Sequence, residues 1–329
     1  MMAIKDVVVN ISKQPLPGNA GVGTPLVIQG KASQAVPYTE CRKIEDVVAA
    51  GFEKETPVYK QCETIFAQDN KPKVVAVCAT AGKISEELPK LKNHQFRQII
   101  PVLGADDTLQ AIMTYVDTTP DKMVFATVKK ETDIAQNKSD RLFAIVYNGK
   151  STTVEGAIVG ASAGYKAGEI TYKNLILKGI EPEDLLEDRI NAIHKAGAIC
   201  ILKKAGDVVT SEGYVTSGEY ADVIDSIDFI INEIGYKTQK LLNTSPKIPF
   251  SNNGIAQLEA VTYGVMSTAF NQGIVGVTDK GAPDFATNFL KREDLDPDDV
   301  RGRIYNGGKF SFSVMGAIHY AEINGLLTM

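Results

Sequence analysis

Short β-type runs alternate with helical segments between residues 73 and 163. The runs at 74–78 and 142–146 are almost entirely apolar, which is typical of strands that are covered on both faces of a sheet. Because strands that alternate with helices need crossover connections, this part of the chain predicts an α/β fold with a mainly parallel sheet. The other strands expected are 24–29, 98–102 and 122–128, and the helices expected are 44–50, 57–68, 106–117 and 152–163.

The second half of the chain has a different pattern. A helix is expected at 182–195 and another at 253–270, where Glu259 is the one charged residue and burial is therefore expected. Thr216 and Glu219 have the spacing of a capping box, and the helix expected after them carries an apolar stripe. The stripe consists of Tyr220, Val223, Ile224, Ile227, Ile230, Ile231 and Ile234. The β elements expected are a hairpin at 198–210 and runs at 301–305, 309–315 and 319–326. This half predicts a C-terminal mixed α+β domain, so that the whole chain is α+β overall.

Both ends of the chain are strand-like. The run at 4–11 offers apolar side chains on both faces, with Val7 and Val9 on one and Val8 on the other. A chain of 329 residues should hold two domains, at roughly 100–200 residues per domain. We expect an N-terminal arm and linker at 1–23, an α/β domain at 24–165, a C-terminal domain at 166–318 and a C-terminal arm at 319–329, with the strand at 24–30 assigned to either domain.

Charge and residue usage argue against several classes of function. The net charge of −5 gives no global electrostatic reason to bind nucleic acid or an anionic membrane. Apolar runs are far shorter than the roughly 18–20 residues that span a bilayer, and the start lacks a secretory signal, so synthesis in a cytoplasm is expected. The cysteines and histidines show no ligand spacing, and the cysteines are expected to be reduced and buried. They are Cys41, Cys62, Cys78 and Cys200, with His94, His194 and His319.

Three glycine-containing segments could be nucleotide sites. Residues 18–24 resemble a phosphate loop, but the lysine is absent and Pro25 follows, so a flexible linker is the better interpretation. Residues 78–82 and 103–107 follow expected strands, where an α/β protein would bind a nucleotide. Neither carries a dinucleotide fingerprint, and plain strand-to-helix turns are preferred.

Three further patterns have both a structural and a functional interpretation. The acidic run at 294–299 begins like a calcium loop but lacks the glycine and glutamate that such a loop requires, so an acidic surface loop is expected. Asp222, Asp225 and Asp228 could form a metal cluster, but a solvated or partner-facing helix side is preferred. Cys78 ends an apolar strand without an assignable base, and an inert core thiol is preferred. We therefore expect no catalytic residue, no metal and no cofactor.

Three segments resemble contractile phage tail sheath proteins and their relatives in phage-tail-like bacteriocins. They are 51–60 (GFEKETPVYK), 171–182 (TYKNL followed by KGIEP) and 213–228 (GYVTSGEYADVIDSID), and the last is the most specific. The resemblance covers residues from 52 to the end. The chain is short for that family, like a minimal sheath without decorating domains, and it lacks the tryptophan that many relatives place in the helix at 222–229.

The resemblance implies a structural role in a virion tail. Subunits would form sixfold rings, stacked helically around a tail tube, with terminal arms that complete a sheet in neighbouring subunits. A baseplate signal would trigger contraction, which drives the tube through the host envelope. The implied partners are other copies of the chain, the tail tube protein, and baseplate and tail terminator proteins, with assembly in the bacterial host cytoplasm.

Two sets of residues are candidates for these contacts. The arm candidates are Ile4, Val7, Val8, Val9 and Ile11 at the start, and Tyr320, Ile323 and Leu326 at the end. Basic residues near the C-terminal β region are candidates for the tube contact, namely Lys291, Arg292, Arg301, Arg303 and Lys309. Two alternatives stay open, an α/β nucleotide-binding enzyme and a generic self-assembling tube or shell component.

Overall fold

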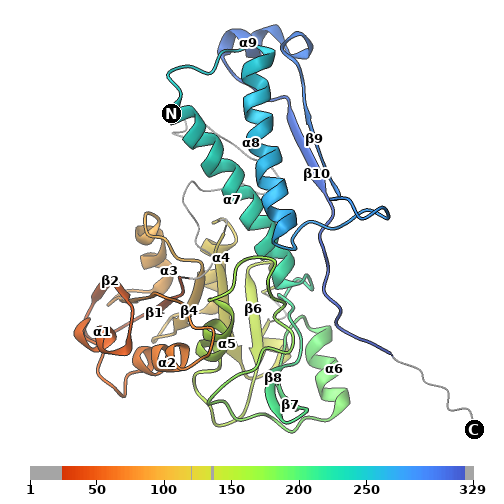
Figure 1. Cartoon of the computed structure of the whole chain (residues 1–329). Helices are drawn as coiled ribbons and strands as arrows, with labels where there is room; N and C mark the ends of the chain where they lie inside the picture. The colour runs from red at the N-terminus through yellow and green to blue at the C-terminus, as the bar shows by residue number, and fades with distance from the viewer. Residues whose placement is uncertain (1–23, 120, 135–136, 323–329) are drawn as a thin grey trace, which may run out of the picture.

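A computed structural model (Figure 1) describes residues 24–119, 121–134 and 137–322. Its centre is a six-stranded sheet with strand order β2-β3-β1-β4-β5-β6. The strands are β1 (Leu26–Gln29), β2 (Val36–Cys41), β3 (Val75–Ala79), β4 (Gln98–Val102), β5 (Met123–Val128) and β6 (Leu142–Val146). All neighbouring strands are parallel except β2, which pairs antiparallel with β3 at one edge. The mainly parallel α/β sheet is thus confirmed, and β1 lies in its middle.

Helices cover both faces of this sheet. In β1, Val27 points to one face, whereas Leu26 and Ile28 point to the other, as the period of two in a strand requires. The first face packs against α1 (Ile44–Ala49), α2 (Pro57–Phe66) and α5 (Val154–Ser162). The second packs against α3 (Ile84–Glu87), η1 (Leu88–Leu91), α4 (Leu109–Val116), η2 (Glu131–Ile134) and α6 (Glu187–Lys195). The apolar strands predicted from the sequence are therefore buried on both sides.

The small residues of α5 allow it to lie directly on α2. A Cβ atom added at Gly160 would lie 2.7 Å from the carbonyl oxygen of Ile65, which is closer than real Cβ contacts come. Helix α2 starts where Thr56 accepts a hydrogen bond from the Tyr59 amide (3.3 Å) and Pro57 fills the first turn. These local signals place α2 and α5 side by side on the sheet.

A second unit projects from one end of the sheet (Figure 1). It consists of α7 (Ala221–Thr244), α8 (Asn252–Asn271), β9 (Phe285–Phe289), η3 (Arg292–Asp294), α9 (Pro297–Gly302) and β10 (Gly308–Phe312). Strands β9 and β10 pair antiparallel, with Phe285 opposite Phe312. Its small core joins Ile230, Val265 and Met266 to the half-buried Phe310 and other apolar residues of the unit. We call it the projecting unit; it confirms the expected mixed α+β second part.

The expected hairpin at 198–210 is also confirmed. Strands β7 (Ile201–Lys204) and β8 (Asp207–Thr210) are antiparallel. The two turn residues, Ala205 and Gly206, both have positive φ, 50° and 99°, as the common two-residue hairpin turn requires.

Two expected helix starts are wrong. The helix predicted at 182–195 begins at Glu187, because the Glu183 amide donates to Ile201 O (3.0 Å) and keeps the preceding chain extended. Thr216 does not cap α7, which begins five residues later. Its hydroxyl oxygen instead accepts from the Ser139 amide (3.0 Å) and its proton is donated to Asn137 O (2.6 Å).

Three other expectations in the second half need correction. The β run at 301–305 is wrong, since α9 runs to Gly302 and starts with Asp296 accepting from the Asp298 amide (2.8 Å). Helix α8 is not buried all round, because it packs on α7 with one face and leaves Tyr263 56% exposed. The described part of the run at 319–326 is not a strand, and the rest of that run lies outside the described residues.

Candidate functional site

A buried charged cluster joins the projecting unit to the sheet. Three basic residues each come directly before a strand, Arg97 before β4, Lys122 before β5 and Arg141 before β6. The first turns of α7 bring Asp225 and Asp228 onto this edge, where they are 7% and 3% exposed. The cluster therefore lies at the amino ends of three parallel strands. We call it the charged joint.

The geometry of the charged joint satisfies most of its charges directly. Arg97 Nη1 lies 2.6 Å from Asp228 Oδ2, and its Nε donates to Asp225 Oδ1 (3.2 Å). Arg141 holds Asp228 with two hydrogen bonds, of 2.9 Å to Oδ1 and 2.5 Å to Oδ2. Tyr172 donates its hydroxyl proton to Asp225 Oδ2 (2.8 Å). Paired, bidentate contacts of this kind are the strong class of hydrogen bond.

Charges balance within the joint. Burial would raise the pKa of Asp228, but Arg97 and Arg141 outweigh it and hold the pKa below its ordinary value. Burial alone would lower the pKa of Arg97, and the two aspartates raise it above the usual range. Burial and Asp225 together raise the pKa of Tyr172, so the phenol stays protonated. With Lys122 and Asp121, whose side chains lie 3.4 Å apart, the joint holds three positive and three negative groups.

The expectation of a solvated or partner-facing helix side is therefore wrong for Asp225 and Asp228, which are buried within the subunit. Asp222, one turn earlier, is half-buried, and burial raises the pKa of its carboxyl. Spacing alone could not reveal the partners, because Arg97 and Arg141 lie 128 and 87 residues away from the aspartates they bind. The sequence nevertheless contains one indication of the cluster, because a basic residue comes directly before each of three apolar strands.

At the opposite edge of the sheet, where α/β enzymes bind ligands, the side chain of Asp107 links two of the turns. Asp107 Oδ1 accepts from the Ile84 amide at the start of α3 (2.9 Å), and Oδ2 accepts from the Gly104 amide (3.0 Å). The Gly30 amide donates to Val102 O at the end of β4 (3.2 Å), and the Lys31 amide donates to Gly82 O (2.9 Å). These four amides are therefore bound within the chain, and the contacts support plain turns at 78–82 and 103–107.

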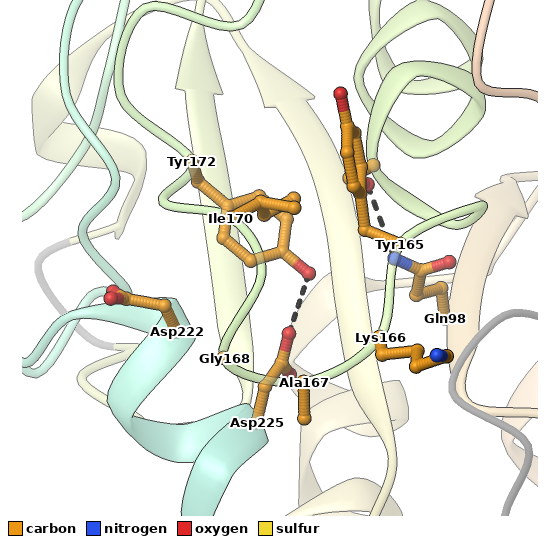
Figure 2. A pocket seen from close by; sticks show the side chains of 10 residues that line it. Gln98, Tyr165, Lys166, Ala167, Gly168, Ile170, Tyr172, Asp222 and Asp225 are labelled. Carbon is orange, nitrogen blue, oxygen red and sulfur yellow. Dashed lines mark hydrogen bonds between the residues drawn. The ribbon is translucent and has the colours of Figure 1, made fainter. Parts of the chain in front are cut away.

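A small pocket lies beside the charged joint (Figure 2). Its cavity volume is about 10 Å³, and Gln98, Tyr165, Gly168, Tyr172 and Asp225 are among its lining residues. Figure 2 shows the hydrogen bond from Tyr172 to Asp225 at one wall. A cavity of this size has room for about one water molecule, whereas sites for drug-sized ligands are usually about 300–1,000 Å³, so this pocket is too small for a nucleotide.

The burial of the cysteines, the grouping of potential metal ligands and the character of the helices bear on the remaining expectations. All four cysteines are free and buried, as expected, and burial raises the pKa of Cys78 to about 11. Within the described ranges, no group of three His, Cys, Asp or Glu side chains is arranged to hold a metal ion. In the same ranges, no helix combines the length and apolar character that crossing a membrane requires.

The basic tube-contact candidates gather at the far end of the projecting unit. Lys291 and Arg292 follow β9, Arg301 and Arg303 lie at the end of α9, and Lys309 is the second residue of β10; all are exposed. Five acidic residues lie among them, namely Glu293, Asp294, Asp296, Asp298 and Asp299. The segment 291–309 therefore carries five charged residues of each sign.

The arm candidates fall mostly outside the described residues. Ile4, Val7, Val8, Val9 and Ile11 lie there, as do Ile323 and Leu326. Tyr320 is described and is 80% exposed.

The mainly parallel sheet with its projecting helical unit is the fold of contractile tail sheath proteins, as comparison with solved structures shows. A chain of the anti-feeding prophage baseplate, solved with sixfold symmetry, matches with a TM-score of 0.75 over 100% of both chains at 10% identity. The contracted sheath complex of an extracellular contractile injection system matches with a TM-score of 0.73 over 99% of this chain and 98% of that one, at 11% identity. A sheath tail protein from Listeria innocua matches with a TM-score of 0.61 over 90% and 96%, at 10% identity.

The likeness is one of fold along the whole chain rather than of sequence. No protein-family model matches the sequence, and no curated protein matches it.

Proposed function

We propose that this protein is a structural subunit of a contractile tail sheath. Copies stack as sixfold rings around a tail tube and contract to drive the tube through the host envelope. The observation that carries the proposal is the full-length match to chains from sheath and baseplate assemblies. The proposed location is the tail of a virion or tail-like particle, assembled in the cytoplasm of a bacterial host. The proposed partners are other copies of the chain, the tube protein, and baseplate and terminator proteins, and no catalysis is involved.

Residues 1–23 and 319–329 are proposed to be arms that pair with neighbouring subunits, on either side of an α/β domain at 24–165 and a C-terminal domain at 166–318. The described hairpin of β9 and β10 has only two strands, and a sheet of two strands is marginally stable alone. An added strand from a neighbour would satisfy backbone groups along its edge. This hairpin is therefore the proposed acceptor of an arm.

The exposed residues Lys291, Arg292, Arg301, Arg303 and Lys309 are proposed to contribute to the tube contact. Because acidic residues lie among them, the contact would consist of many individually weak, exposed charge pairs. Such pairs break at little cost, which suits a surface that must release during contraction.

Electron microscopy of the purified full-length chain tests the proposal. Regular tubes or stacked sixfold rings are expected. A single small oligomer at every concentration would favour the α/β enzyme, and closed shells or tubes without sixfold rings would favour a generic assembly protein.

A further inference from the structure

One side chain of the C-terminal segment is folded back onto the subunit. After β10 the chain runs toward the α/β part and then away from it (Figure 1). The Met315 amide donates to Ile274 O (2.8 Å), and four residues later His319 is mostly covered, with 15% of its side chain exposed. Its neighbours Ile318 and Tyr320 are 88% and 80% exposed.

His319 contacts three groups that belong to the body of the subunit. Its Nε2 lies 2.9 Å from Thr171 Oγ1, and its Nδ1 lies 3.3 Å from Glu212 Oε2. Its ring meets the ring of Tyr220 edge-on, with centroids 4.8 Å apart. Glu212 is itself buried and paired with Lys173. The imidazole therefore lies in a recess in which Glu212 is already held by Lys173.

We propose that His319 is an anchoring residue, which fixes the point and direction in which the C-terminal segment leaves its own subunit. In an extended segment, alternate side chains point to opposite sides. With His319 turned inward, Ile318 and Tyr320 are turned outward, and they form an apolar face for a second copy of this chain. This inference deepens the proposed function, on which the identity of the partner rests.

The amount of chain beyond the anchor favours a second copy as the occupant. Seven residues follow the described part, INGLLTM, and they could span about 25 Å when extended. Four of the seven are apolar. A fixed starting point would lower the entropy that such a segment loses when it binds a neighbour.

A spin label tests the anchor without requiring assembly. All four native cysteines are buried, so a nitroxide attached to Ala321→Cys, which is exposed, reports selectively on this segment. In the soluble subunit, His319→Ala should lower the ratio of immobile to mobile label by up to about tenfold, the effect of losing one hydrogen bond. His319→Gln, which can still bond Thr171, should fall between the two, and Ile318→Ala should leave the label unchanged.

Assembly tests the apolar face. Ile318→Ala combined with Tyr320→Ala should raise the protein concentration needed for polymer formation about tenfold or more, while the label stays immobile in the soluble subunit. An equally immobile label in His319→Ala would overturn the anchor, and unchanged assembly of the double variant would overturn the interface. If the unchanged chain never polymerises, the proposed function fails, and with it the second copy as the partner, whereas the label still decides whether His319 anchors the segment.

Discussion

Replacing Asp228 with asparagine removes one negative charge from the charged joint with almost no change in volume. Two guanidinium groups would then lose their shared carboxylate, because Arg97 and Arg141 both bind Asp228, at 2.6 Å and 2.5 Å. All three side chains are at least nine-tenths buried. Breaking a buried pair by removing one partner costs about 3–5 kcal/mol. We therefore expect Asp228→Asn to lower the free energy of unfolding by about that amount.

Asp222→Asn is the matched control, since it makes the same chemical change on the same helix two turns earlier. Burial raises the pKa of Asp222, so its ionised form is disfavoured in the folded chain. Its replacement should change stability by less than about 1 kcal/mol. Urea unfolding of the dilute, unassembled protein measures both variants, and the midpoint should fall markedly for Asp228→Asn without a change in slope. Equal effects of the two substitutions would refute the role assigned to the joint.

The pH dependence of this difference follows from the lowered pKa of Asp228. A carboxyl group whose folded pKa is lower than its unfolded pKa of about 3.9 stabilises the fold above that unfolded value. The contribution is lost as the pH falls through the folded pKa. The difference between the unchanged protein and Asp228→Asn should thus be full at neutral pH and shrink below about pH 4.

Three further predictions concern the ends, the tube contact and a histidine. Deleting residues 1–12 or 319–329 should leave a soluble, cooperatively melting chain that forms no tubes; unfolding of either truncation would show that this end belongs to its own core. Burial lowers the pKa of His194, although Glu212 opposes the shift. Because the folded chain favours the neutral ring, this histidine stabilises the fold above pH about 6.5, and the contribution is lost as the pH falls below that value. In urea titrations at several pH values, His194→Gln should weaken the dependence of the unfolding free energy on pH, and an unchanged pH dependence would contradict the role given to His194. Charge reversal at several of the tube-contact candidates should weaken co-sedimentation of the protein with the tube, and unchanged binding would contradict the proposed contact. These candidates are Lys291, Arg292, Arg301, Arg303 and Lys309.

The central sheet could be predicted because its strands are short, apolar runs between turn signals. Strands β4 and β6 have the predicted limits, and β1, β3 and β5 differ by one or two residues. Strand β2 was missed because it is an edge strand with a proline and four partly or fully exposed residues, so that neither alternation nor a continuous apolar run marks it.

The second half was harder to predict because its elements depend on distant partners. The sequence contains the usual signals for the start of α9, with Asp296 as the cap and Pro297 in the first turn. The acidic composition of residues 294–299 nevertheless favoured a loop. The burial of Asp225 and Asp228 depends on strands more than 80 residues earlier in the chain. Aspartate is rarely buried unless it is paired, so local pattern alone favours a solvated face.

Electron microscopy of the full-length chain, purified alone and concentrated, tests the central claim most directly. The proposed sheath function predicts tubes whose cross-section shows sixfold rings and whose wall accommodates the α/β sheet and the projecting unit of each subunit. A protein that stays monomeric, or forms one small closed oligomer at every concentration, would contradict it.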